Sequence, residues 1–164
     1  VFDQSWALLS GDERLIFAKL SVFRGGFAGE AAKQVAGASL LDLAGLVEKS
    51  LIGRESADRF GMHELLRQYA TEQLAALGQA EAAQARHSQY FAEFMRTQEP
   101  ELKGPRQLAT MQAIDRDFDN IRLAWVWSLE RRHAAHHERV GGAGVGPRVG
   151  RRPSSATSSR PETA

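Results

Sequence analysis

Apolar residues recur at helical spacing near the start of the chain, in short runs separated by glycine and serine. Ser10 followed by Glu13 is a capping box, which marks a helix N-terminus. Gly37 ends a second, alanine-rich run, and Ser39 can cap the run that follows it. The pattern therefore predicts three short helices, over residues 12–20, 30–36 and 40–49.

Two extended runs come next, at residues 51–54 and 59–62, with polar residues 55–58 between them. This pattern predicts a small β-hairpin. Helical periodicity returns at His63, because the apolar residues that follow fall on one side of a helix: Leu65, Leu66, Tyr69, Ala70, Leu74 and Leu77. Three helices, a hairpin and a further helix are the element order of a winged-helix domain, which we expect over residues 1–78.

Residues 79–132 have the pattern of a helical linker and the first elements of a helical repeat, paired as antiparallel hairpins. One helix is expected over residues 80–98, and another from Gly104 to about Arg116. Asp119 is the expected N-cap of a last helix, NIRLAWVWSLERR, which is too apolar on all sides to stand alone. The chain is therefore predicted to be mainly α-helical.

The composition changes near Arg132, where Gly, Pro, Ser and Arg replace the large apolar residues. Residues 133–164 cannot bury enough surface to offset the entropy of ordering, so we predict a disordered tail. The tail is also basic, because residues 131–164 carry 7 Lys and Arg against 2 Asp and Glu. Residues 1–130 carry 14 Lys and Arg against 18 Asp and Glu, so the folded part is mildly acidic.

The chain has no cysteine and no apolar run of the ~18 residues that a membrane helix needs. These features predict a soluble, cytoplasmic protein without a membrane partner. The first residue, Val1, enters directly into a helix-like pattern, so the chain is expected to be a fragment of a larger protein.

Motifs for catalysis, cofactors and metals are missing from the pattern. We find no Ser-His-Asp set, no HExxH and no P-loop, so the chain is predicted not to be an enzyme. The string GGAGVG at residues 141–146 follows no strand and is interpreted as flexible tail. His133, His136 and His137 lie in the same tail and are expected to bind no functional metal.

Direct DNA binding is disfavoured by charge. The third helix of a DNA-binding winged helix should present basic and amide side chains to base edges. Residues 40–49 offer one lysine, and the hairpin balances its two arginines with two acids. Leu40, Leu43 and Val47 are expected to share one face of this helix.

His63 stands where the hairpin turns into a helix. It is either a helix-start residue that fills space beside the hairpin, or part of an anion site that also uses the helix N-terminal amides. The pattern alone leaves both interpretations open.

The sequence resembles a known family at three places: SWALLSGDERLIFAKLSVFRGGF, LLDLAGLVEKSLI and RFGMHELLRQYATEQL. These stretches are similar to the winged-helix segment that follows the nucleotide-binding core in bacterial STAND ATPases. Such NB-ARC-like signal-transduction ATPases occur in large LuxR-type and SARP-type transcriptional regulators. RHSQYFAEF and DRDFDNIRLAWVWSLE are similar to the helical linker and first tetratricopeptide-like helices that come next. The resemblance covers roughly residues 5 to 130.

The resemblance implies a regulatory role. In the family, the winged helix packs on the ADP-bound core in the resting state, and the histidine of a Met-His-Asp-like motif contacts the β-phosphate. By position, His63 would be this nucleotide sensor, Met62 would pack beside it, and Glu64 would hold the helix start. Ala28 stands where many relatives have a capping Ser or Thr. The family's P-loop is absent here, so this chain alone is expected to bind no ATP or ADP.

The leading hypothesis is therefore a regulatory, non-enzymatic fragment of a STAND-type transcriptional regulator, whose partner is a nucleotide-binding ATPase core. One alternative is a standalone winged-helix DNA-binding transcription factor. Another, compatible with the first, is a helical adaptor that binds a protein through the apolar side of residues 121–129, including Trp125 and Trp127.

Overall fold

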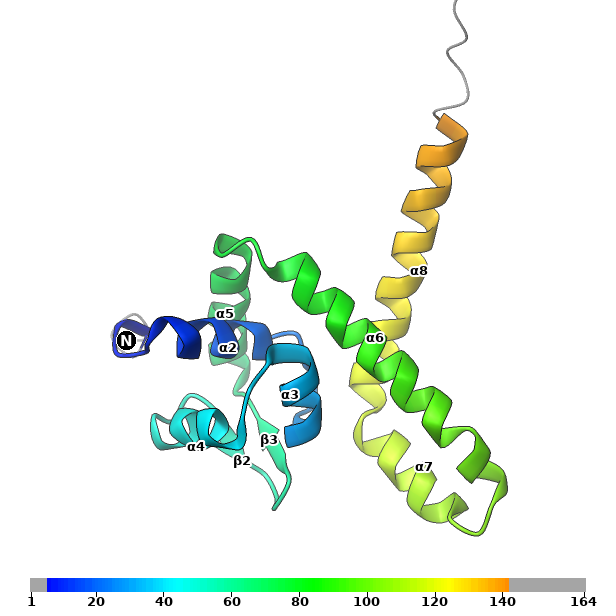
Figure 1. Ribbon diagram of the computed structural model, residues 1–164, viewed down its shortest axis with the longest axis horizontal. Helices are drawn as coiled ribbons and strands as arrows, with labels where there is room; N and C mark the ends of the chain where they lie inside the picture. Colours follow the sequence, from blue (N-terminus) through cyan, green and yellow to red (C-terminus); the bar gives the residue numbers. More distant parts are fainter. Residues whose placement is uncertain (1–5, 142–164) are drawn as a thin grey trace, which may run out of the picture. The chain divides into compact units, whose positions relative to one another are not determined.

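The computed structural model describes residues 6–141 (Figure 1). The described part of residues 1–131 forms one compact unit, and residues 132–141 belong to a second. The predicted mainly α-helical, winged-helix-like fold is confirmed. Within residues 6–141, no helix is both long and apolar enough to cross a bilayer.

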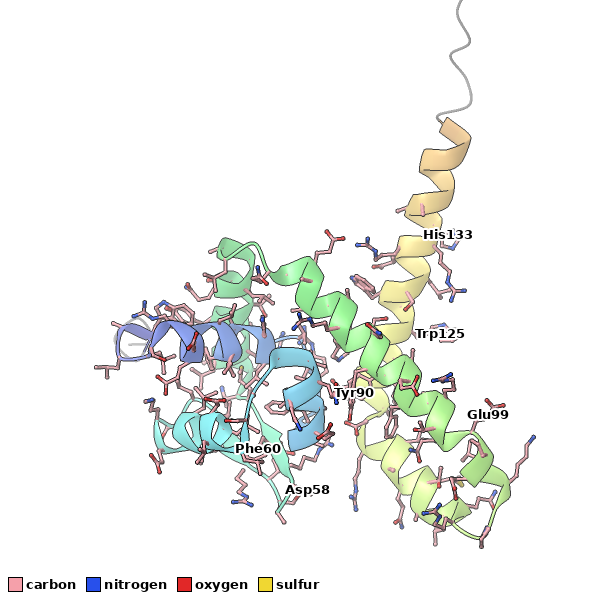
Figure 2. The ribbon with its side chains drawn as sticks, in the orientation of Figure 1. Asp58, Phe60, Tyr90, Glu99, Trp125 and His133 are labelled. Carbon is pink, nitrogen blue, oxygen red and sulfur yellow. The ribbon has the colours of Figure 1, made fainter. Side chains whose placement is uncertain are left out.

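The winged helix combines four helices with a small sheet, in the predicted order (Figure 1). The structure bounds its elements as α2 (Gly11–Leu20), β1 (Phe27–Ala28), α3 (Gly29–Ala36), α4 (Leu40–Glu48), β2 (Gly53–Arg54), β3 (Arg59–Gly61) and α5 (Glu64–Ala76). The predicted hairpin is confirmed as β2 and β3, and Asp58 lies in the turn between them (Figure 2). Strand β1 was not predicted. It makes the sheet three-stranded, in the antiparallel order β1-β3-β2.

The predicted caps set the helix ends. Ser10 and Glu13 form the capping box of α2, and Ser39 forms a second one with Asp42 at α4. Gly37 ends α3 in the left-handed conformation that glycine adopts without strain. The N-cap of α3 is Ala28, whose side chain makes no capping bond.

The core of the winged helix lies between its helices and one face of the sheet. Phe17, Leu43 and Phe27 are at most 1% exposed. Of the residues predicted to share a face of α4, Leu43 is buried, whereas Leu40 lies in the first turn and is 73% exposed. Leu46 is fully buried instead.

The remaining helices form what we call the helical arm, residues 80–131. Its elements are α6 (Ala80–Gln98), the short 3-10 helix η1 (Pro100–Lys103), α7 (Gln107–Arg116) and α8 (Phe118–Gly141), which continues beyond the arm. Helix α6 has its predicted bounds. Ser88 of α6 donates to the Ala124 carbonyl of α8 at 3.1 Å, which joins the two helices inside the arm.

Helix α8 differs from the prediction at both ends. It begins at Phe118, so Asp119 lies in its first turn and is not its N-cap. It also continues to Gly141, so the prediction of disorder is wrong for residues 133–141. Nucleation is the costly step of helix formation, so a helix that has already formed can be extended at little cost even without apolar contacts. Residues 142–164, which hold the rest of GGAGVG, lie outside the described residues.

Candidate functional site

His63 is the N-cap of α5. Its Nδ1 accepts a hydrogen bond from the backbone N–H of Leu65 at 3.3 Å, and the residue is exposed. Because Nδ1 is the acceptor, the proton of the neutral ring must sit on Nε2. Nε2 has no hydrogen-bond partner within residues 6–141. The backbone therefore fixes one tautomer, with its N–H donor available to an outside acceptor.

The neighbours of His63 have different environments. Met62 is half-buried against the core. Glu64 is exposed and accepts hydrogen bonds from the Arg67 guanidinium and, at 3.1 Å, from Gln68. The hydrogen bonds from Arg67 lower the pKa of Glu64 to about 2, with a smaller effect from Gln68. The Glu64 carboxylate thus already accepts hydrogen bonds from side chains of its own helix.

A small cavity of about 70 Å³ lies beside this helix start. Met62 and Glu64 line it together with Arg24 and Arg67, whereas His63 does not. The structure therefore brings Met62 and Glu64 to one cavity and leaves His63 outside it, on the exposed helix end.

The surface of α4 is apolar. Leu40 and Leu41 are 73% and 85% exposed, and α4 contains no Lys or Arg between Leu40 and Glu48. A groove of about 980 Å³ runs past this surface, between α3, α4 and the hairpin. Lys49, which follows the helix, is paired with Glu13 of α2.

Both arginines of the hairpin already form hydrogen bonds or ion pairs with other groups of the protein. Arg54 donates to the carbonyls of Ser56 and Ala57 inside the hairpin turn, at 3.1 and 2.6 Å. The Arg59 side chain is 14% exposed and forms an ion pair with Asp117 of the arm at 3.2 Å. The phosphate contacts on which DNA affinity depends would have to replace these bonds.

A buried polar cluster, absent from the sequence prediction, joins the winged helix to the arm. Asn120 of α8 is 0% exposed. Its Oδ1 accepts from the backbone N–H of Arg24 at 2.7 Å, and its Nδ2 donates to the Gly26 carbonyl at 2.9 Å. Arg59 donates to the carbonyls of Gly25 and Arg116, at 2.8 and 2.7 Å. We call this set of contacts the junction. RGGF, residues 24–27, supplies the backbone groups that bond to Asn120 and one of the two carbonyls that bond to Arg59.

His87 of α6 completes the junction. It is 0% exposed, and its Nε2 lies 3.3 Å from Asn120 Oδ1. Because the amide Oδ1 can only accept, Nε2 carries the proton, and the buried Nδ1 has no hydrogen-bond partner within residues 6–141. Burial lowers the pKa of His87 to about 4, although the hydrogen bond to Asn120 acts in the opposite direction.

The other residues that the sequence analysis singled out, His133 and the apolar residues 121–129, lie on α8. No group of three or more His, Cys, Asp or Glu side chains that could hold a metal occurs in the described residues, and His133 is exposed on α8 (Figure 2). On α8, Ile121 packs against the core and Trp127 lies 5.0 Å under the Arg131 guanidinium. Trp125 is 68% exposed and projects from the helix (Figure 2).

These features define a mainly helical winged-helix domain whose third helix is apolar and free of basic residues, fixed to a helical arm. The chain is 33% identical over 141 aligned residues to curated proteins of Mycobacterium bovis and Mycobacterium tuberculosis that are named "Putative HTH-type transcriptional regulator". The alignment covers 80% of this chain but 16% of each relative. No family model matches the chain, and no solved structure matches it.

The similarity supports a link to transcriptional regulators of the helix-turn-helix type. Since the chain spans about one sixth of these relatives, the helix-turn-helix in their name can lie in the matched segment or elsewhere.

Proposed function

We propose that this chain is a regulatory segment of a longer, cytoplasmic, STAND-type transcriptional regulator. In this proposal the winged helix binds a nucleotide-binding core and holds the regulator in its resting state. The observation that carries the proposal is helix α4, where Leu40 and Leu41 are exposed and which itself contains no Lys or Arg. An apolar patch of this kind suits a protein partner better than a phosphate backbone.

His63 would link this docking to nucleotide. Its Nε2–H is exposed at the start of α5, close to the unpaired amides of the helix N-terminus. A phosphate oxygen accepts hydrogen bonds from such donors. ADP held by the core would therefore be contacted by His63 when the winged helix is docked. The chain itself supplies no P-loop, so in this proposal the core binds the ATP or ADP and carries any hydrolysis.

The test uses the longer regulator and compares two substitutions. His63→Ala removes the ring and the cap, whereas His63→Asn removes the ring but keeps a good N-cap. We expect both variants to release bound ADP faster than the unsubstituted protein and to raise basal signalling. Unchanged ADP release in both variants would exclude the phosphate contact. Faster release in His63→Ala alone would assign the effect to the cap.

DNA binding by this segment is the second candidate, because the relatives are named as HTH-type regulators. A gel shift of the chain at increasing salt separates the two proposals. Phosphate contacts make affinity fall steeply with salt. We expect no sequence-specific shift. A specific, salt-dependent shift that survives removal of residues 133–164 would favour the DNA-binding candidate.

A protein partner for the arm is a further, compatible proposal. Trp125 and Leu129 are exposed on the same helix, at 68% and 40%. Sedimentation of the chain with and without Trp125→Lys tests it through self-association. We expect the unsubstituted chain to associate with rising concentration and the variant to remain monomeric. Equal self-association of the two chains would contradict an interaction surface at Trp125.

A further inference from the structure

Besides the packing of α6 on α3, hydrogen bonds join the arm to two separate places on the winged helix. Asn120 bonds to the loop between α2 and β1, through the Arg24 N–H and the Gly26 carbonyl. Arg59 extends from β3 and bonds to Asp117 and to the Arg116 carbonyl, at the end of α7. One hydrogen bond can act as a hinge. Bonds that leave from different elements fix an orientation.

The loop itself is closely packed between hairpin and arm. Gly25 and Gly26 have φ values of +65° and +84°. A Cβ on Gly26 would lie 2.9 Å from the Phe60 carbonyl oxygen, and one on Gly25 would lie 3.2 Å from a carboxylate oxygen of Asp119. The two glycines therefore let the backbone approach the hairpin on one side and α8 on the other.

Aromatic packing adds a third attachment, from α6. The Phe23 ring lies 5.3 Å from His87 and 6.3 Å from Phe91, both in edge-to-face geometry. Phe91 is 1% exposed. The loop between α2 and β1 is thus held by aromatic contacts to α6 and by hydrogen bonds to α8, and these attachments cannot all rotate about one axis.

We propose that the junction is a rigid coupling, through which the winged helix and the helical arm move as one body. A partner that displaces the arm would move the hairpin with it, because Arg59 belongs to β3. This coupling does not depend on what the winged helix binds. Its failure would leave the proposed function untouched.

The coupling can be measured as a distance distribution between spin labels. The chain has no native cysteine, so Glu72→Cys on α5 and Ala109→Cys on α7 place one label on each part at exposed positions. We expect one narrow distribution for the otherwise unsubstituted chain. Adding Arg59→Gln and Asn120→Ala should broaden it at least twofold. A distribution that is already broad without these changes, or one that stays narrow with them, would overturn the proposal.

Two further variants separate coupling from general damage. Arg106→Ala removes an ion pair to Glu101 that lies wholly within the arm, and it should leave the distribution narrow. Arg59→Gln alone keeps Asn120 and the buried core, so it remains informative if the double variant does not fold. It should broaden the distribution and speed exchange of amide protons in α7 relative to α2. An unchanged distribution in this folded variant would also overturn the proposal.

Discussion

The winged helix buries many large apolar side chains, although Leu40 and Leu41 are exposed, whereas Phe91 is the one large apolar side chain that the described part of the arm buries. In the winged helix, Phe17, Leu20 and Leu43 are at most 1% exposed. In the arm, Leu108 and Trp125 are 71% and 68% exposed. Burial of apolar surface is the main favourable term in folding, so the winged helix holds much of its own stability. The arm depends more on its attachment.

The buried residues of the arm are largely polar. His87, Ser88, Thr110 and Asn120 are each at most 5% exposed, beside the apolar Ala83, Phe91 and Ala124. Buried polar groups need specific partners, and this requirement restricts geometry more than apolar packing does. The comparison indicates that apolar burial sets the stability of the winged helix, whereas hydrogen bonds set the position of the arm.

The largest expected effect comes from the core of the winged helix. Phe17→Ala should lower the free energy of unfolding by about 3–5 kcal/mol, because it leaves a cavity among fully buried neighbours. Phe118→Ala makes the same truncation on α8, where Phe118 is 56% exposed, and should cost less than about 1 kcal/mol. Urea denaturation followed by circular dichroism measures both. Equal losses would remove the contrast between the two regions.

Asn120→Ala should have the next largest effect. It leaves three groups without their partner: the Arg24 N–H, the Gly26 carbonyl and the ring N–H of buried His87. An unsatisfied buried group costs about 1–3 kcal/mol, and the two backbone groups are only part-buried, so we expect a loss of about 3 kcal/mol. Thermal unfolding measures this loss. The control is Arg106→Ala, which removes only the exposed ion pair between Arg106 and Glu101. A loss below about 1 kcal/mol would mean that water replaces Asn120 without penalty.

His87 makes the junction sensitive to acid. Its pKa is about 4 in the folded state and 6.5 in the reference state, so below pH 6.5 the unfolded chain binds more protons. Stability is therefore lost as pH falls through this window. The loss between pH 7 and pH 5 should be about 2 kcal/mol. Denaturant titrations of the unsubstituted chain and of His87→Gln at both pH values measure it, and the variant should lack this component.

Local signals in the sequence predicted the winged helix well. The capping box at Ser10, the N-cap at Ser39 and the glycine stop at Gly37 depend on residues close in the chain, and all three occur in the structure. Strand β1 escaped prediction because its partner, β3, lies more than 30 positions away, so no local turn marks the pairing as it does in the hairpin. The start of α8 was misplaced by two residues, because an acidic residue in the first turn looks like an N-cap.

The junction could not be predicted because its partners are far apart in the chain. Asn120 and Gly26 are separated by 94 positions, and Arg59 and Arg116 by 57. A glycine pair that only ends a helix has the same local pattern as one whose carbonyls also accept hydrogen bonds from distant side chains. The helical continuation through residues 133–141 was missed for a different reason. Disorder was predicted because this segment lacks an apolar face to bury, but the extension of an existing helix does not need one.

The smallest expected effect concerns the candidate site itself, where stability and function can be separated. His63→Ala should cost about 0.5–1 kcal/mol, because the Leu65 N–H loses its cap at an exposed helix end. His63→Asn should restore most of this loss, since asparagine caps as well as any residue. Equilibrium unfolding of both variants checks the difference. A loss of more than about 2 kcal/mol in His63→Asn would show that the ring supports the fold, which would contradict an exposed imidazole available to a phosphate.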